Sequence, residues 1–134
     1  MAGGFPVRLL LDTSAVLHLA AGSLPPQATD VLRAGTPATI SPVTPWELAI
    51  KVKGGKLTLP LPPLEYVISL TNRYRLAFSP ASLDAPLLCA AADLPLIHRD
   101  PFDRILVATA IREQFAIVTP DRTIGSYPGV TTVW

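Results

Sequence analysis

Carboxylates follow two apolar, strand-like stretches of this sequence and are well placed to do chemistry. Asp12 comes directly after Leu9–Leu11, and Asp121 follows an Ile-Val-Thr-Pro run at positions 117–120. In an open parallel sheet, functional groups gather just beyond the carboxyl ends of the strands. Each acid also has a structural explanation, because Asp12 can cap a following helix and Asp121 can form a turn. Position alone leaves both roles open.

A third acid, Glu47, lies near the start of an expected helix. The sequence Thr44-Pro45-Trp46-Glu47 fits a capping box, with Thr44 as the N-cap and Glu47 at the third helical position. Lys51 lies four residues further on and can pair with Glu47 across one helical turn. Taken alone, these features favour a structural role for Glu47.

Asp103 gives the clearest indication of function. It lies in Asp100-Pro101-Phe102-Asp103, where Asp100 can cap the helix and pair with Arg104. Asp103 falls instead on the face of the apolar stripe that this helix directs toward the core. A carboxylate aimed toward a core is costly unless something pairs with it.

Convergence of these four acids would require a cation. Two carboxylates about 5 Å apart repel each other by about 3 kcal/mol at an effective dielectric constant near 20. All-oxygen ligation favours Mg²⁺ or Mn²⁺ over zinc. The two histidines, His18 and His98, match no zinc spacing and are interpreted as surface or packing residues. Cys89 is interpreted as a small core residue.

Apolar runs of strand length alternate with helical stretches, which indicates crossover connections and a parallel sheet. The 134 residues suffice for a single domain, 1–134, of the α/β class. The predicted strands are 7–11, 38–41, 77–79, 115–119 and 130–133. The predicted helices are 14–21, 27–34, 44–53, 64–74, 83–92 and 101–114, and 57–63 is predicted as an extended connector.

Charge and hydropathy exclude several classes of protein. A net charge of +1 excludes a strongly polycationic DNA-coating protein but not a nucleic-acid enzyme. No stretch approaches the roughly 20 apolar residues of a membrane span. Asp12 interrupts the apolar run near the N-terminus, and no cationic region precedes it, so we expect no export signal. We therefore expect a cytoplasmic protein.

Four segments, in order along the chain, resemble the PIN-domain family and, within it, the VapC-type ribonuclease toxins. They read LLLDTSAVL, TPWELAIKVKGGKL, HRDPFDRILVATA and IVTPDRTI. The resemblance implies a three-layer α/β/α fold around a short parallel sheet, with a metal-binding cluster at the carboxyl edge. It assigns Mg²⁺ or Mn²⁺ ligation to Asp12, Glu47, Asp103 and Asp121. Thr119 corresponds to a small hydroxyl residue beside the fourth acid.

Two positions depart from the family pattern. Ser14 stands where many relatives of this branch have histidine, and Pro120 stands where a small residue is usual. Neither change removes an acid.

The resemblance further implies hydrolysis of RNA phosphodiesters, inhibition by an antitoxin protein, and a homodimer. The candidate phosphate contacts are Lys51, Lys53, Lys56, Arg99 and Arg122. Residues 57–66, with Trp46 nearby, are candidates for either protein contact, or they pack internally.

Two alternatives remain open from the sequence. One is a phosphatase with Asp12 as the nucleophile, although Ser14 occupies the position where such enzymes typically carry a second Asp. The other is a non-catalytic PIN module that binds RNA or protein.

Overall fold

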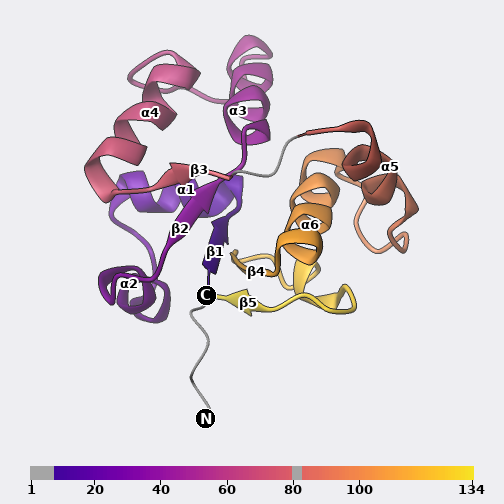
Figure 1. The fold of residues 1–134 in the computed structure, drawn as a ribbon. Helices are drawn as coiled ribbons and strands as arrows, with labels where there is room; N and C mark the ends of the chain where they lie inside the picture. Colours follow the sequence, from indigo (N-terminus) through magenta and orange to yellow (C-terminus); the bar gives the residue numbers. More distant parts are fainter. Residues whose placement is uncertain (1–7, 80–82) are drawn as a thin grey trace.

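A five-stranded parallel sheet forms the centre of the molecule (Figure 1). The computed structural model describes residues 8–79 and 83–134, so Val7, predicted as the first strand residue, lies outside the described residues. The strand order is β3-β2-β1-β4-β5. The strands are β1 (Arg8–Leu11), β2 (Ala38–Ile40), β3 (Ala77–Phe78), β4 (Phe115–Val118) and β5 (Thr132–Val133).

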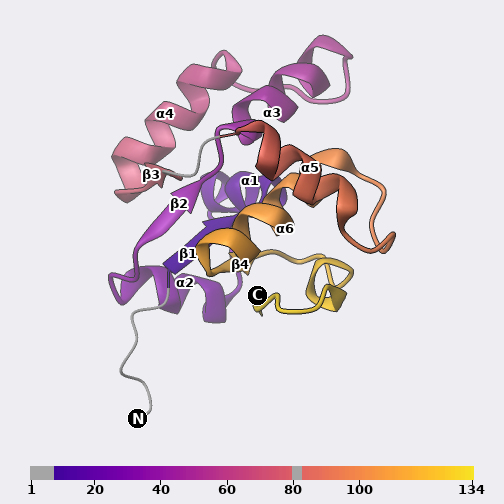
Figure 2. The same ribbon diagram turned by 45° about the vertical axis from the view of Figure 1, so that its right-hand side comes forward.

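Helices connect the strands and cover both faces of the sheet. They are α1 (Thr13–Ala21), α2 (Pro26–Arg33), α3 (Val43–Lys53), α4 (Pro63–Tyr74), α5 (Ala85–Asp93) and α6 (Pro101–Glu113), followed by the short 3₁₀ helix η1 (Ile124–Ser126). In Figures 1 and 2, α5 and α6 lie together on one side of the sheet, and α1, α3 and α4 lie on the other. This is the three-layer α/β/α arrangement predicted from the sequence.

Successive side chains of a strand point to opposite faces of the sheet, and this divides the core into two clusters. Leu9 and Leu11 of β1 face the cluster with α1 to α4, whereas Leu10 faces the cluster with α5 and α6. A strand covered on both faces needs apolar residues at every position, which is why β1 has three consecutive leucines, all fully buried. β1 pairs with β2 on one side and β4 on the other, so it is the central strand.

The capping box predicted at Thr44 is wrong, because α3 begins one residue earlier, at Val43. β2 ends at Ile40, and the Ser41 hydroxyl accepts a hydrogen bond from the Val43 backbone N–H at 3.1 Å. Ser41 therefore supplies the side-chain acceptor that was assigned to Thr44. Within the described part of the chain, the Thr44 hydroxyl is buried without a hydrogen-bond partner.

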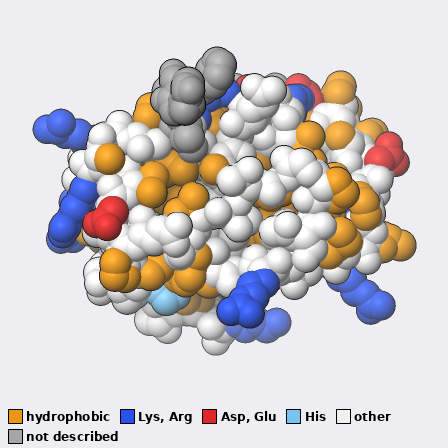
Figure 3. Space-filling view, turned by 90° about the horizontal axis from the view of Figure 1, so that it is seen from below, with side chains coloured by type: hydrophobic (Ala, Val, Ile, Leu, Met, Phe, Trp, Pro, Cys, Tyr) orange, Lys and Arg blue, Asp and Glu red, His pale blue; other side chains and the backbone are white. Residues whose placement is uncertain are grey.

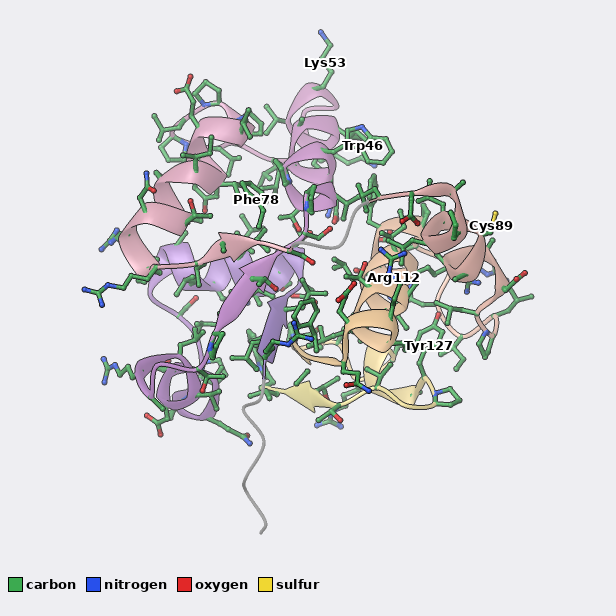
Figure 4. All side chains as sticks on the ribbon, in the orientation of Figure 1. Trp46, Lys53, Phe78, Cys89, Arg112 and Tyr127 are labelled. Carbon is green, nitrogen blue, oxygen red and sulfur yellow. The ribbon has the colours of Figure 1, made fainter. Side chains whose placement is uncertain are left out.

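Cys89 is exposed on α5, so its assignment to the core is wrong (Figure 4). Helix α5 is short and packs mainly through Leu87 and Ala91, which leaves Cys89 on the outer face. No helix of residues 8–79 and 83–134 combines the length and apolarity needed to cross a membrane.

Two helices, α1 and α3, begin at the carboxyl edge of the sheet. α1 begins two residues after β1 ends, and α3 begins shortly after the end of β2. The carboxyl ends of β1, β2 and β4 lie at this edge because the three strands are parallel and in register. The N-termini of α1 and α3 therefore carry their partial positive charges to the carboxyl edge of the sheet.

Candidate functional site

The four predicted acids line one pocket at the carboxyl edge of the sheet. The pocket has a volume of about 420 Å³. Asp12 follows β1, Glu47 is the fifth residue of α3, Asp103 lies in the first turn of α6, and Asp121 lies in the turn after β4. Four separate segments thus place their carboxylates in the same pocket.

Asp12 is held rigidly and is only 3% exposed. Its Oδ1 accepts a hydrogen bond from the Ala15 backbone N–H at 2.7 Å, which caps α1, and its Oδ2 accepts one from the Thr119 hydroxyl at 2.5 Å. Burial raises the pKa of Asp12 above its usual value, although both hydrogen bonds oppose this shift. The capping role and the pocket position are therefore compatible, because each uses a different oxygen.

Glu47 is also 3% exposed and has a partner at each oxygen. The Thr13 hydroxyl donates to Oε1 at 2.6 Å, and Lys51 Nζ lies 2.7 Å from Oε2, as the spacing of four residues predicts. The hydrogen bond to Glu47 raises the pKa of Lys51. Lys51 also lines the pocket, so it adds one positive charge among the acids.

Among the acids of the pocket, Asp103 has the most strongly raised pKa. Burial raises its pKa from 3.8 to about 7, repulsion from Asp100 adds to the shift, and His98 opposes it. The Asp103 carboxylate is thus close to half protonated at neutral pH. A cation bound beside it would remove this penalty.

His98, interpreted from the sequence as a surface or packing residue, contacts two of the acids. Its Nε2 lies 2.9 Å from Asp121 Oδ2 and 3.1 Å from Asp103 Oδ2. Burial works to raise the pKa of Asp121, but hydrogen bonds from Thr123 and His98 outweigh it, and the pKa is lowered. The one available signal in the sequence was that His98 lies in the same segment as Asp103.

The other candidate residues fall into three groups. Thr119 touches the site, since its hydroxyl donates to Asp12 and accepts from the Asp121 backbone N–H at 3.0 Å. Arg99 and Arg122 are exposed and directly follow His98 and Asp121 in sequence. Lys53, at the far end of α3, projects away from the site (Figure 4), and Lys56 lies in the exposed turn beyond it.

Arg104 does not pair with Asp100 as its spacing suggested. Its guanidinium instead donates to four backbone carbonyls at the end of α5 and in the loop that follows, namely those of Ala92, Leu94, Pro95 and His98, at 2.8 to 3.1 Å. Asp100 does cap α6, because its Oδ1 accepts from the Phe102 N–H at 2.9 Å.

A second pocket of about 660 Å³ lies near the amino ends of β2 and β3 and includes Arg33 and Arg75. Among the described residues, its lining holds no carboxylate. Figure 3 shows the molecule from below, where apolar side chains are scattered over the surface together with several Lys or Arg and a few Asp or Glu side chains. The acidic pocket is therefore the better candidate for metal chemistry.

The chain belongs to the PIN-domain family, because the model of that family, described as PIN domain, matches residues 9–129. It is 29% identical over 97 residues to Ribonuclease VapC22 of Mycobacterium tuberculosis. This alignment covers 71% of this chain and 72% of that protein.

Solved structures share the fold. VapBC2 from Rickettsia felis, bound to a promoter DNA fragment, matches with a TM-score of 0.67 at 15% identity, covering 94% of this chain and 97% of the other. DNA-bound VapBC from Salmonella typhimurium gives a TM-score of 0.64 at 18% identity, covering 94% and 96%. PAE2754 from Pyrobaculum aerophilum gives 0.58 at 18% identity, covering 98% and 88%.

Proposed function

We propose that this protein is a metal-dependent endoribonuclease and the toxin of a toxin–antitoxin pair. The observation that carries the proposal is the convergence of Asp12, Glu47, Asp103 and Asp121 on one pocket. The curated relative named as a ribonuclease, and the likeness in fold to VapBC proteins, support the same activity.

The donor set fits a hard divalent cation. Its oxygens are mostly carboxylate, which suits Mg²⁺ or Mn²⁺. Burial raises the pKa values of Asp12 and Asp103, so the protein itself does not fully stabilise their ionised forms. We assign direct ligation to Asp12 and Asp103, with Glu47 and Asp121 bound directly or through water.

When bound, the cation supplies a charge that activates water and stabilises the anionic transition state. The residues of this chain orient the reaction. Thr119 and the N-terminus of α1 fix both oxygens of Asp12, so this carboxylate keeps one orientation. We assign phosphate binding to Lys51, which lines the pocket, and to the exposed Arg99 and Arg122 beside it.

The enzymatic alternative, a phosphatase with Asp12 as nucleophile, is less well supported. The position two residues after Asp12 is Ser14, where such enzymes typically carry a second Asp. Trapping of a covalent phosphoenzyme would favour it. A non-catalytic module is also less well supported, because all four acids are present.

For the antitoxin contact we propose the outer surface of α3 and α4. Trp46 is 57% exposed and packs edge-on against Phe102 with ring centroids 5.1 Å apart. Residues 57–66 include both buried and exposed side chains. Tyr66 is buried in the core, whereas Leu61 and Leu64 are 43% and 56% exposed. The competing assignment is a homodimer that uses part of this surface. Sedimentation of the protein alone and with its antitoxin would distinguish the antitoxin contact from the homodimer.

The test uses protein purified free of inhibitor and incubated with labelled total RNA, in chelator, Mg²⁺ or Mn²⁺. We expect cleavage only with metal, and none by Asp12→Asn. Asparagine keeps the oxygen that caps α1, so this variant should fold. The matched control is Asp30→Asn, an exposed acid on α2, which should cut like the wild type. Cleavage by Asp12→Asn at the wild-type rate would refute the assignment.

A further inference from the structure

We infer that His98 is a positioning residue of the acidic site, whose Nε2–H donates to Asp121 and lies against the Asp103 carboxylate, an arrangement called here the Nε2 bridge. The inference rests on the proposed function and extends it to a residue outside the four acids. Asp103 belongs to α6 and Asp121 to the turn after β4, so the bridge joins two separate elements.

The geometry of the bridge is compact. Ligand-type atoms of His98, Asp103 and Asp121 all lie within 4.8 Å of one another. His98 Nε2 forms a hydrogen bond with Asp121 Oδ2 at 2.9 Å and lies 3.1 Å from Asp103 Oδ2, and its side chain is 20% exposed. A single donor placed between two carboxylates reduces their repulsion and fixes their separation.

A backbone contact on the other side of the ring determines which nitrogen carries the proton. The Asp100 backbone N–H donates to His98 Nδ1 at 3.1 Å, so Nδ1 acts as an acceptor and carries no proton. The proton of the neutral ring is then on Nε2, in the hydrogen bond to Asp121 and close to Asp103. Metal ligation through Nε2 would move the proton to Nδ1, where it would face the Asp100 N–H. The geometry therefore favours a bridging donor over a metal ligand.

The loop carrying His98 is anchored on both sides of its backbone. The His98 N–H donates to the Tyr127 hydroxyl at 2.8 Å, and Arg104 donates to the His98 carbonyl at 3.1 Å. Arg104 is only 8% exposed. These contacts place the ring without using its nitrogens, which leaves Nε2 available to the acids.

The experiment measures Mn²⁺ affinity by calorimetry for the wild type and three variants. His98→Ala removes the donor, and we expect about 10- to 100-fold weaker binding, the range for residues that orient metal ligands. His98→Gln places an amide N–H near the position of Nε2 and should recover most of that loss. The matched control is His18→Gln, at the only other histidine of the sequence, where no change is expected. His18 bonds to Ser23 instead.

Two spectroscopic readouts separate positioning from ligation and from a structural effect. Nitrogen-15 NMR of the metal-free protein should give His98 protonated at Nε2 and not at Nδ1. Pulsed electron paramagnetic resonance of bound Mn²⁺ should give no coupling to an imidazole nitrogen. Circular dichroism should be unchanged in all variants.

Four outcomes would overturn the inference: a proton on Nδ1, a manganese–nitrogen coupling that His98→Ala abolishes, wild-type affinity in His98→Ala, or no recovery in His98→Gln. If the wild type bound no Mn²⁺, the proposed function would fail on its own. The NMR result would then still decide whether the Nε2 bridge exists.

Discussion

Replacing Asp103 with asparagine should stabilise the metal-free protein at alkaline pH. Each pKa unit corresponds to about 1.4 kcal/mol, so a pKa raised from 3.8 to about 7 means that ionised Asp103 costs the folded state about 4 kcal/mol. The folded pKa lies above the unfolded one, so protonation of Asp103 favours folding. This stabilisation is complete below about pH 4 and is lost as the pH rises through about 7.

The assay is urea unfolding in chelator at about pH 5.5 and about pH 8.5, between which Asp103 alone should lower the free energy of unfolding by about 2 kcal/mol. Asp103→Asn should lack this loss and should be the more stable protein at the higher pH. Asp30→Asn, which changes an exposed acid on α2, controls for net charge. Added Mn²⁺ should reverse the order by stabilising the wild type.

Two results would refute the reasoning. One is an equal pH dependence in the wild type and Asp103→Asn. The other is an Asp103→Asn protein that is less stable than the wild type at the higher pH without metal.

Three further predictions follow from contacts around the pocket. Thr119→Val removes the hydroxyl bound to Asp12 and should weaken Mn²⁺ binding by about 10- to 100-fold in calorimetry; unchanged affinity would contradict the orienting role. Arg104→Met leaves partly buried backbone carbonyls without donors and should lower the free energy of unfolding by about 3 kcal/mol in urea titrations; a loss below about 0.5 kcal/mol would show that water replaces the guanidinium. Lys51→Met removes a positive charge bound to Glu47 and should raise Mn²⁺ affinity by about threefold; weaker binding would mean that Lys51 organises the site.

Much of the architecture and the convergence of the acids could be predicted because both depend on local patterns. Three consecutive leucines followed by Asp12 indicate a buried strand and its end, and the parallel arrangement then fixes the edge at which that acid lies. The same reasoning locates Asp121 after β4. Helical spacing correctly paired Lys51 with Glu47.

The bridge made by His98 could not be predicted, because it depends on a loop without periodicity. The path of that loop is set by hydrogen bonds from Arg104, and spacing alone pointed Arg104 at Asp100 instead. The start of α3 was missed for a related reason. Ser41 and Thr44 are both capable caps, and only the point at which β2 ends decides between them.

The pairing of β1 with β4 makes the order of synthesis matter. The Thr119 hydroxyl meets Asp12 across 107 positions of sequence, and β4 forms only after most of the chain is made. Domains generally fold as units, so this sheet is not complete before β4 is made. During translation, Asp12, Glu47 and Asp103 emerge before Asp121 and cannot be assembled with it until β4 has docked. A nascent chain would therefore have an incomplete pocket through most of its synthesis, which gives a partner time to bind before the last acid arrives.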